Sequence, residues 1–321
     1  MIITVTLNPA IDKTVTIPNF TVSQVNRIET LRTDVGGKGI NVSKCLKELG
    51  CESMAAAFWG GDAGRSGEAQ LRESGADQLS QRIGGADIQS LPVFIQETTR
   101  TNMKIIDEVQ GQNTDINEPG PQIKPEELEL LIQKLDENLK ESDILVLAGS
   151  IPKGISSDIY KELTTRYKEK GVKVFLDADG ESFAEGIKAV PYLIKPNIDE
   201  LSRLAGEKLT DIRGILKAVK PLLQSGIEKI VVSMGAQGAV FIQRGRIFIA
   251  SSIDVPVLST VGAGDSMVAA LAYGEEKGLD EKKTYKLSMA MGAASVMCSG
   301  TQAPKAVTVE SLYHMVNIIE L

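Results

Sequence analysis

The residues best suited to chemistry lie in a short glycine-rich segment that ends at Asp265. Its Gly262, Ala263 and Gly264 let a ligand approach the backbone, and a helix is predicted to begin at about Ser266. Free N–H groups and the helix dipole would stabilise the charge of a phosphoryl group in transfer. Asp265 could accept a proton from an attacking hydroxyl. A plain turn with Asp265 as an ordinary N-cap is the structural alternative.

A second glycine-rich segment, much earlier in the chain, contains Gly37, Lys38 and Asn41. A helix is predicted from Ile40 to Leu49, so flexible backbone, a cation and an amide gather near a helix start. Such a group could bind the hydroxyls and phosphate of a substrate, although glycine-rich turns are common. Lys38 is followed by glycine, so the segment is not a Walker loop, and no G-x-G-x-x-G opens a helix.

The composition limits the classes of function. Thirty-five basic and 42 acidic side chains leave a net charge of −7, which argues against broad attraction to nucleic acid or to an anionic membrane. Any anionic ligand then needs a local basic cluster. The one histidine, His314, excludes multi-histidine metal sites and argues against a Ser-His-Asp triad. Catalysis would rest on carboxylate, lysine or backbone groups.

Cysteine usage and hydropathy indicate a cytoplasmic protein. Cys45, Cys51 and Cys298 form an odd and sparse set that suggests neither a disulfide framework nor a zinc site. The first ten residues lack the basic flank of a signal peptide. The longest charge-free stretch, Leu287–Pro304, is too polar to span a bilayer. We therefore expect no membrane partner.

Apolar strands alternate with amphipathic helices along most of the chain. Short apolar runs predict strands at Ile2–Leu7, Ile144–Ala148, Val172–Leu176, Tyr192–Lys195 and Lys229–Ser233. Helical segments separate them, and two final helices are predicted at Glu281–Cys298 and Val309–Ile319. This order is typical of an α/β protein whose doubly wound, mainly parallel sheet is flanked by helices. No linker or repeat interrupts it, so we expect a single domain over residues 1–321.

Two stretches, residues 13–34 and 91–117, break this order. The second has alternating segments at Val93–Thr98 and Asn102–Asp107 with a turn at Gly111, and both stretches predict antiparallel strands. Together they could form a small antiparallel β lid over the ligand face of the main sheet. Edge hairpins without a lid role are the alternative. Because exposed sheet edges invite pairing, a homodimer through the lid is plausible.

The two glycine-rich segments, together with Asp12 at a strand end, resemble those of the ribokinase-like sugar kinases, also called the phosphofructokinase B family. Further motifs agree in order and spacing at Thr6–Asp12, Gly149–Gly154, Ile194–Asn197 and Ser233–Gly238. The resemblance covers essentially the whole chain. It implies a ribokinase-like fold, ATP as phosphoryl donor, Mg²⁺ as metal cofactor and a small-molecule sugar phosphate as substrate.

The resemblance assigns residues to the sugar and to its phosphate. Binding of sugar hydroxyls is implied for Asp12, Gly37 and Asn41. The side chains implied to surround the substrate phosphate are Lys38, Arg100, Lys104 and Ser150. Guanidinium and ammonium groups suit a phosphate dianion, and arginine can bind two oxygens at once. Taken singly, the charges on the 100–104 segment could instead be solvated on a strand face.

On the nucleotide side, Asn197 and Glu200 share one face of a predicted helical turn and resemble the family's Asn-x-x-Glu element. That element orders magnesium and nucleotide phosphates largely through water, so Glu200 is the implied metal residue. ATP contacts are implied for Lys195, Asn197, Ser233, Met234, Gly235, Ala236, Gln237, Gly238 and Gly264. Helix capping and a plain β-turn are the structural alternatives. Asp179, two residues after Asp177, departs from the small or hydroxylic residue expected there.

Within the family the chain is most similar to the 1-phosphofructokinases, at Arg100–Lys104, Thr114–Asn117 and Ser259–Val268. This similarity implies transfer of the γ-phosphoryl group of ATP to fructose 1-phosphate, giving fructose 1,6-bisphosphate, with Asp265 as general base. A tagatose-6-phosphate kinase is the alternative, because it shares most of the motifs. A noncatalytic sugar-phosphate sensor is a more distant one, and a nicotinamide dehydrogenase would need a dinucleotide fingerprint that the sequence lacks.

Overall fold

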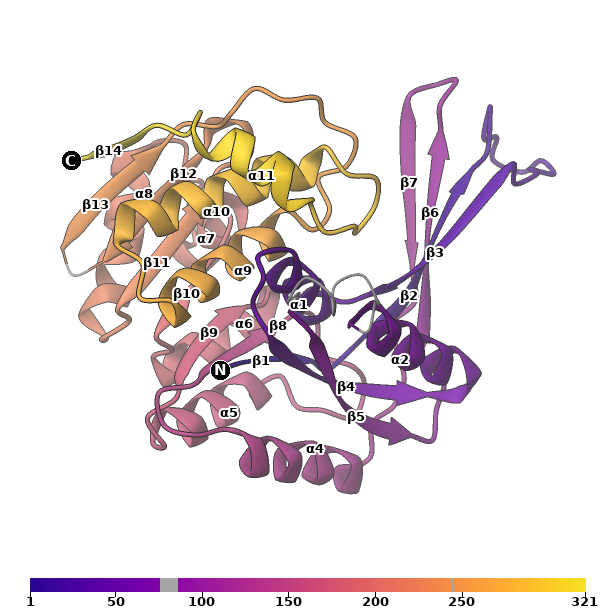
Figure 1. Cartoon of the computed structure of the whole chain (residues 1–321), viewed down its shortest axis with the longest axis horizontal. Helices are drawn as coiled ribbons and strands as arrows, with labels where there is room; N and C mark the ends of the chain where they lie inside the picture. Colours follow the sequence, from indigo (N-terminus) through magenta and orange to yellow (C-terminus); the bar gives the residue numbers. More distant parts are fainter. Residues whose placement is uncertain (76–85, 244) are drawn as a thin grey trace.

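A large sheet forms the centre of the molecule in the computed structural model, which describes residues 1–75, 86–243 and 245–321 (Figure 1). Its strands lie in the order β14 (Ile318–Glu320), β13 (Arg246–Ala250), β12 (Ala239–Gln243), β11 (Lys229–Ser233), β10 (Leu193–Ile194), β9 (Lys173–Asp177), β8 (Ile144–Ala148), β1 (Ile2–Thr6), β4 (Ser53–Gly60) and β5 (Ile88–Ile95). Neighbours from β11 to β5 are parallel, and those from β11 to β14 are antiparallel. The predicted mainly parallel sheet is confirmed.

Helices cover both faces of this sheet because its strands are apolar on both sides. Ile144 and Val146 face one core and Leu145 and Leu147 the other, and all four are buried. One face carries α4 (Pro125–Asn138), α5 (Ile159–Lys168), α6 (Gly180–Gly186), α7 (Ile198–Ala205) and α8 (Ile212–Gln224). The other carries α1 (Lys38–Glu48), α2 (Gly61–Gly75), α9 (Ala263–Glu276), α10 (Glu281–Val296) and α11 (Ala306–Tyr313). None of the helices in the described parts of the chain has the length and apolar character needed to cross a membrane.

A small separate sheet projects from one end of the large sheet (Figure 1). Its strand order is β3 (Thr30–Gly36), β2 (Ala10–Thr16), β6 (Arg100–Asp107) and β7 (Gln112–Asn117). The two outer pairs are antiparallel, as predicted, but β2 and β6 at its centre are parallel. This sheet is therefore two antiparallel hairpins joined side by side. Its action as a lid remains a prediction.

One strand predicted for the small sheet belongs to the large one. The expected antiparallel strand Val93–Thr98 is wrong, because β5 ends at Ile95 and runs parallel to β4. An edge strand is buried on one face only, and Phe94 is 56% exposed. Its sequence therefore alternates like that of a hairpin strand. The second segment of the small sheet comprises residues 100–117.

Three boundaries differ from the sequence prediction in ways that affect the site or the chain end. The helix α9 begins at Ala263, so Asp265 lies inside its first turn. Asp12 lies in the middle of β2 and not at the end of β1. The predicted final helix is wrong in its second half, because α11 ends at Tyr313 and residues 318–320 pair with β13. Short apolar runs such as this last one fit either a helix or a strand.

Candidate active site

A cleft of about 1260 Å³ lies beside the carboxyl ends of the central parallel strands, where the small sheet meets the large one. Such an edge is the usual ligand site of open α/β sheets. Every residue that the sequence assigns to the site lines this cleft except Gln237, which lies in the same 3-10 turn (Gly235–Gln237) as residues that do. The structure thus brings the predicted residues together, while their individual roles remain predictions.

The start of α9 forms one wall of the cleft. Gly262 is the N-cap with φ of 85°, a left-handed conformation that favours glycine. The first backbone bond within the helix runs from the N–H of Ser266 to the carbonyl of Gly262, at 2.9 Å. The N–H groups of the intervening residues therefore point out of the helix end. A Cβ on Gly264 would lie 3.0 Å from Nζ of Lys195, so a cation stands beside these N–H groups.

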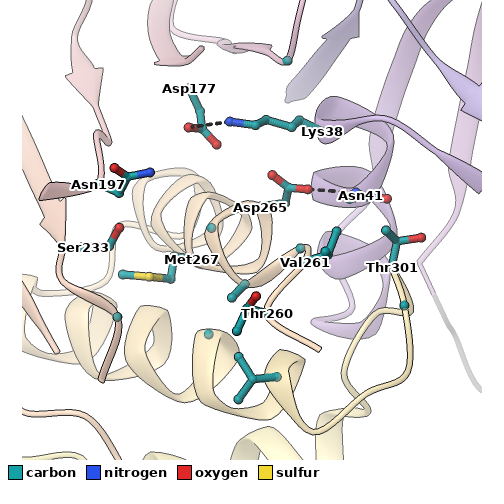
Figure 2. Close-up of a pocket in the computed structure, with 18 of the residues that line it drawn as sticks. Lys38, Asn41, Asp177, Asn197, Ser233, Thr260, Val261, Asp265, Met267 and Thr301 are labelled. Atoms are coloured by element: carbon teal, nitrogen blue, oxygen red, sulfur yellow. Dashed lines mark hydrogen bonds and ion pairs between the residues drawn. The ribbon is translucent and has the colours of Figure 1, made fainter. Parts of the chain in front are cut away.

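Asp265 is held in this wall as a buried carboxylate that is only 5% exposed. Asn41 of α1 donates from Nδ2 to its Oδ2 at 2.8 Å (Figure 2). Burial raises the pKa of Asp265 to about 6, against the opposing attraction of Lys38 and with a further push from the charge of Asp177. A carboxylate with a pKa in this range can both accept and release a proton near neutral pH.

Asp177, at the end of β9, joins two lysines, and Figure 2 shows its contact with one of them, Lys38. Its Oδ1 lies 3.4 Å from Nζ of Lys38 and 3.5 Å from Nζ of Lys195, and Asp177 is 2% exposed. Burial alone would raise the pKa of Asp177, but the two ammonium groups outweigh this effect, so the pKa is lowered below its ordinary value. Burial likewise opposes the charge of Lys38, yet Asp177 and Asp265 raise the pKa of that lysine. Asp177 and Lys38 therefore remain charged around neutral pH.

Asp12 lies on the opposite wall, in the small sheet. Asn102 of β6 donates from Nδ2 to its Oδ1 at 3.0 Å, and Thr301 donates to its Oδ2 at 3.5 Å. Burial raises the pKa of Asp12, and the hydrogen bond from Asn102 partly offsets this increase. Gly36 leaves room for this carboxylate, because a Cβ there would lie 1.9 Å from Oδ2 of Asp12.

The basic residues of the small sheet also reach the cleft. Arg100 donates to the carbonyls of Asn8 at 2.9 Å and Glu118 at 3.2 Å, and Lys104 pairs with Asp115 at 3.1 Å. Burial lowers the pKa of Arg100 against the attraction of Asp12. Lys104 is 16% exposed and its partner 50%, so an anionic ligand could replace this partner.

Several buried polar atoms, each on a residue that lines the cleft, have no hydrogen-bond partner among the described residues. They are Asn8 Oδ1, Asn41 Oδ1, Asn102 Oδ1, Arg100 Nε and Asp177 Oδ2. In each asparagine the amide nitrogen already donates to an oxygen, which fixes the orientation and leaves the carbonyl oxygen free. Because buried polar atoms are rarely left unpaired, their concentration here indicates a polar ligand.

Asn8, Asn102, Asp177 and Thr301 were not assigned by the sequence. Asn8 and Asn102 lie inside motifs quoted for the family resemblance, but a single asparagine has no spacing pattern that reveals its role. Ser150, which was assigned, accepts from Nδ2 of Asn8 at 3.2 Å. The signal that identifies these residues is three-dimensional.

The nucleotide side combines a capped helix with an apolar wall. Asn197 and Glu200 form a capping box at the start of α7, with both reciprocal bonds at 2.8 Å, so the capping alternative is realised. A parallel bridge joins Asn197 to Ser233 (Figure 2). Asp179 is exposed at the cleft edge. The apolar side chains that line this part are Ile253, Val255, Val257, Met267 and Met289, which suits a flat nucleotide base.

The donor set fits magnesium held largely by water and phosphate. Within the described ranges, no three His, Cys, Asp or Glu side chains cluster so that they could hold a metal ion. Glu200 uses Oε2 in its capping box, and Asp177 has an unpartnered Oδ2. Mg²⁺ retains several waters and commonly takes only one or two carboxylates from the protein.

The cleft on this α/β sheet combines a helix start with free N–H groups, two lysines and a buried carboxylate. Groups of these kinds suit phosphoryl transfer. The family model "pfkB family carbohydrate kinase" matches residues 5–308, and the chain belongs to this family. It is 35% identical over 318 residues to the 1-phosphofructokinase of Rhodobacter capsulatus, covering 99% of this chain and 97% of that protein. It is also 33% identical over 324 residues to a tagatose-6-phosphate kinase of Staphylococcus epidermidis, with both chains fully covered.

The fold agrees with solved structures of the family. The crystal structure of phosphofructokinase-2 from Escherichia coli in complex with potassium matches with a TM-score of 0.90 and 26% identity, covering 98% of each chain. The ribokinase-like fold, predicted from the sequence, is thereby confirmed. The chain is a carbohydrate kinase, and the kinases of its family use ATP as phosphoryl donor.

The shared carboxylate of Asp177 predicts a large stability difference between two neighbouring substitutions. Asp177→Asn leaves Lys38 and the buried Lys195 without their anion, so the free energy of unfolding should fall by about 3 kcal/mol at pH 7. Asp179→Asn, the matched control at an exposed position, should change it by less than about 0.5 kcal/mol. Urea unfolding of both variants measures the difference, and equal effects would contradict the pairing described here.

Proposed function

We propose that this carbohydrate kinase transfers the γ-phosphoryl group of ATP to fructose 1-phosphate, giving fructose 1,6-bisphosphate. The observation that carries the proposal is the buried Asp265 at the exposed N–H groups of α9, beside Lys195. The name of the Rhodobacter capsulatus relative supports fructose 1-phosphate. The Staphylococcus epidermidis relative supports tagatose 6-phosphate as the second candidate substrate. We place this activity in the cytoplasm, consistent with three free cysteines.

In the proposed reaction, Asp265 takes the proton of the attacking sugar hydroxyl. The oxygen of that hydroxyl forms a bond to the γ-phosphorus. The bond from that phosphorus to the β–γ bridging oxygen breaks, and ADP leaves. The N–H groups at the start of α9 and Nζ of Lys195 stabilise the charge that spreads over the transferred group. Glu200 and Asp177 would hold Mg²⁺, which when bound would neutralise charge on the nucleotide phosphates.

The substrate is held from the side of the small sheet. Asp12 and the free carbonyl oxygens of Asn41 and Asn102 are acceptors for sugar hydroxyls. Arg100, Lys104 and Lys38 supply positive charge for the substrate phosphate, in a protein whose net charge of −7 provides none at long range. The proposed substrate is therefore a sugar that already carries a phosphate.

Asp265→Asn tests the proton acceptor. The amide has nearly the same shape but no basicity, so turnover should fall roughly 10²- to 10⁴-fold while ATP binding changes little. Steady-state kinetics and calorimetric titration with ATP measure the two effects. Near-normal turnover in a folded variant would remove Asp265 from this role.

The pH profile gives an independent test of the same group. The base must be ionised, and the pKa of Asp265 is raised to about 6, so activity is present above this pH and lost as pH falls through it. The plot of log kcat/KM against pH should rise with unit slope below about pH 6 and level off above it. Asp265→Asn should lack this limb in its residual activity. A wild-type profile that stays flat down to pH 5 contradicts the assignment.

Substrate choice is tested with fructose 1-phosphate, fructose 6-phosphate, tagatose 6-phosphate, fructose and ribose, each with ATP and Mg²⁺. The highest kcat/KM should be that of fructose 1-phosphate, and free sugars should be poor because the cations then lack a partner. Lys104→Ala should weaken use of fructose 1-phosphate selectively. A preference for tagatose 6-phosphate would establish the second candidate. Binding of sugar phosphates without any ATP consumption would establish the sensor instead.

We also propose a homodimer through the small sheet. Its edge strands β3 and β7 expose Leu31 and Ile116, with 58% and 53% of their surfaces accessible. Sedimentation velocity should give the dimer mass for the wild type and the monomer mass for Leu31→Asp. Leu130→Asp on α4, which replaces an equally apolar but distant residue at 41% exposure, is the matched control and should remain dimeric. A monomeric wild type contradicts the proposal.

A further inference from the structure

The loop after α10, residues 299–301, lies against the small sheet and connects it to the body. Arg32 of β3 donates from Nη2 to the carbonyl oxygen of Ser299 at 2.7 Å. Thr301 donates from Oγ1 to Oδ2 of Asp12, on β2, at 3.5 Å. Two links therefore join one short loop to two neighbouring strands, and one of them ends on the carboxylate proposed to bind sugar.

The residues that receive this loop share one face of the small sheet. Thr14 lies opposite Arg32 and Asp12 opposite Asp34 in the register of β2 and β3, and alternate residues of a strand face the same way. We call these four residues the anchor face. Gly300 sits directly on it, because a Cβ there would lie 2.5 Å from Nη2 of Arg32 and 3.4 Å from Oγ1 of Thr14. The loop and the anchor face thus fit closely.

A hydrogen bond to Asp34, on the same strand, orients the guanidinium group of Arg32. Its Nε donates to Oδ2 of Asp34 at 2.7 Å, which leaves Nη2 directed at Ser299. The planar guanidinium can hold two acceptors in fixed directions at once. A lysine at this position could neutralise Asp34 but has no rigid fork with which to hold the carbonyl as well.

The link from Thr301 determines how Asp12 presents itself to the cleft. Asn102 holds Oδ1 of this carboxylate, and Thr301 approaches Oδ2 from the other side (Figure 2 labels Thr301). With both oxygens in contact with a donor, rotation of the carboxylate plane is restricted. Without the loop, only the bond from Asn102 would orient Asp12.

We propose that Arg32 is a positioning residue that holds the 299–301 loop so that Thr301 orients Asp12 toward the sugar. The inference rests on the proposed sugar-binding role of Asp12. Arg32 does not line the cleft, whereas Asp12, Gly300 and Thr301 do. It therefore acts through the loop. Because the same loop follows α10, whose Val296 lines the cleft, the contact also ties the small sheet to that helix.

The kinetic test compares Arg32→Gln, Thr301→Val and the double variant. Each single change should raise the KM for the sugar phosphate roughly threefold to tenfold, the effect of one hydrogen bond, and alter kcat and the KM for ATP less than about twofold. The double variant should resemble the worse single variant, because both changes break the same chain of contacts. Arg65→Gln, which breaks an exposed arginine–aspartate pair on α2, is the matched control and should leave all three constants unchanged.

A measurement without any sugar tests the contact separately from the proposed activity. Amide hydrogen exchange over residues 298–302 should be faster in Arg32→Gln than in the wild type and in Arg65→Gln. Arg32→Lys, which retains the charge beside Asp34, should keep the melting temperature yet show the same faster exchange and raised KM. Unchanged exchange in a folded Arg32→Gln protein would refute the anchor.

The failures of the two proposals can be told apart. If the wild type phosphorylates none of the sugar phosphates, the proposed function fails while the exchange experiment still decides whether Arg32 holds the loop. If exchange increases in Arg32→Gln but the sugar KM does not, or if the two single effects add in the double variant, the positioning role is wrong and the contact is only structural.

Discussion

Four charged side chains, those of Asp177, Asp265, Lys38 and Lys195, line the cleft, and the balance of charge among them is the constraint on which the site depends. A buried charge without a partner destabilises a protein by several kcal/mol. Asp177 offsets two ammonium groups at once, while Asp265 has only an amide hydrogen bond and more distant attraction from Lys38. The least compensated carboxylate is therefore the one with the raised pKa. The placement of the neighbouring charges thus gives Asp177 a lowered pKa and Asp265 a raised one.

The order of the strands explains how residues so far apart in sequence reach this cleft. Asn41 follows β3, Asp177 ends β9, Lys195 follows β10, and Asp265 lies in α9. The parallel strands β9 and β10 have their carboxyl ends at one edge of the sheet, so they bring Asp177 and Lys195 there. Asn41 and Asp265 reach the same edge in the first turns of α1 and α9, which follow β3 of the small sheet and the antiparallel β13. The small sheet adds the opposite wall, because β2 and β6 pair across that edge.

Sequence patterns predicted the large sheet, because helix and strand periods are local properties. The family resemblance implied that the two glycine-rich segments belong to one site. The sequence patterns failed where a local pattern has two solutions: β5 alternates as an edge strand of the large sheet, and the last residues form a strand and not a helix. Pairing between distant segments was not predictable either. Asn102 and Thr301 belong to the site because both bond to Asp12. Arg32 is connected to the site only through its bond to Ser299, after the end of α10.

The junction between β3 and α1 has a mechanical consequence. Strand β3 ends at Gly36 and helix α1 begins at Lys38, so Gly37 alone separates them, with φ of 121°. At this junction no loop is available to take up a rotation of the small sheet, so on this path the rotation would act directly on the backbone of Gly37. The next turn of the chain carries Lys38 and Asn41, the partners of Asp177 and Asp265. A turn of the small sheet about Gly37 would therefore move the first turn of α1, whose Asn41 holds the carboxylate of Asp265.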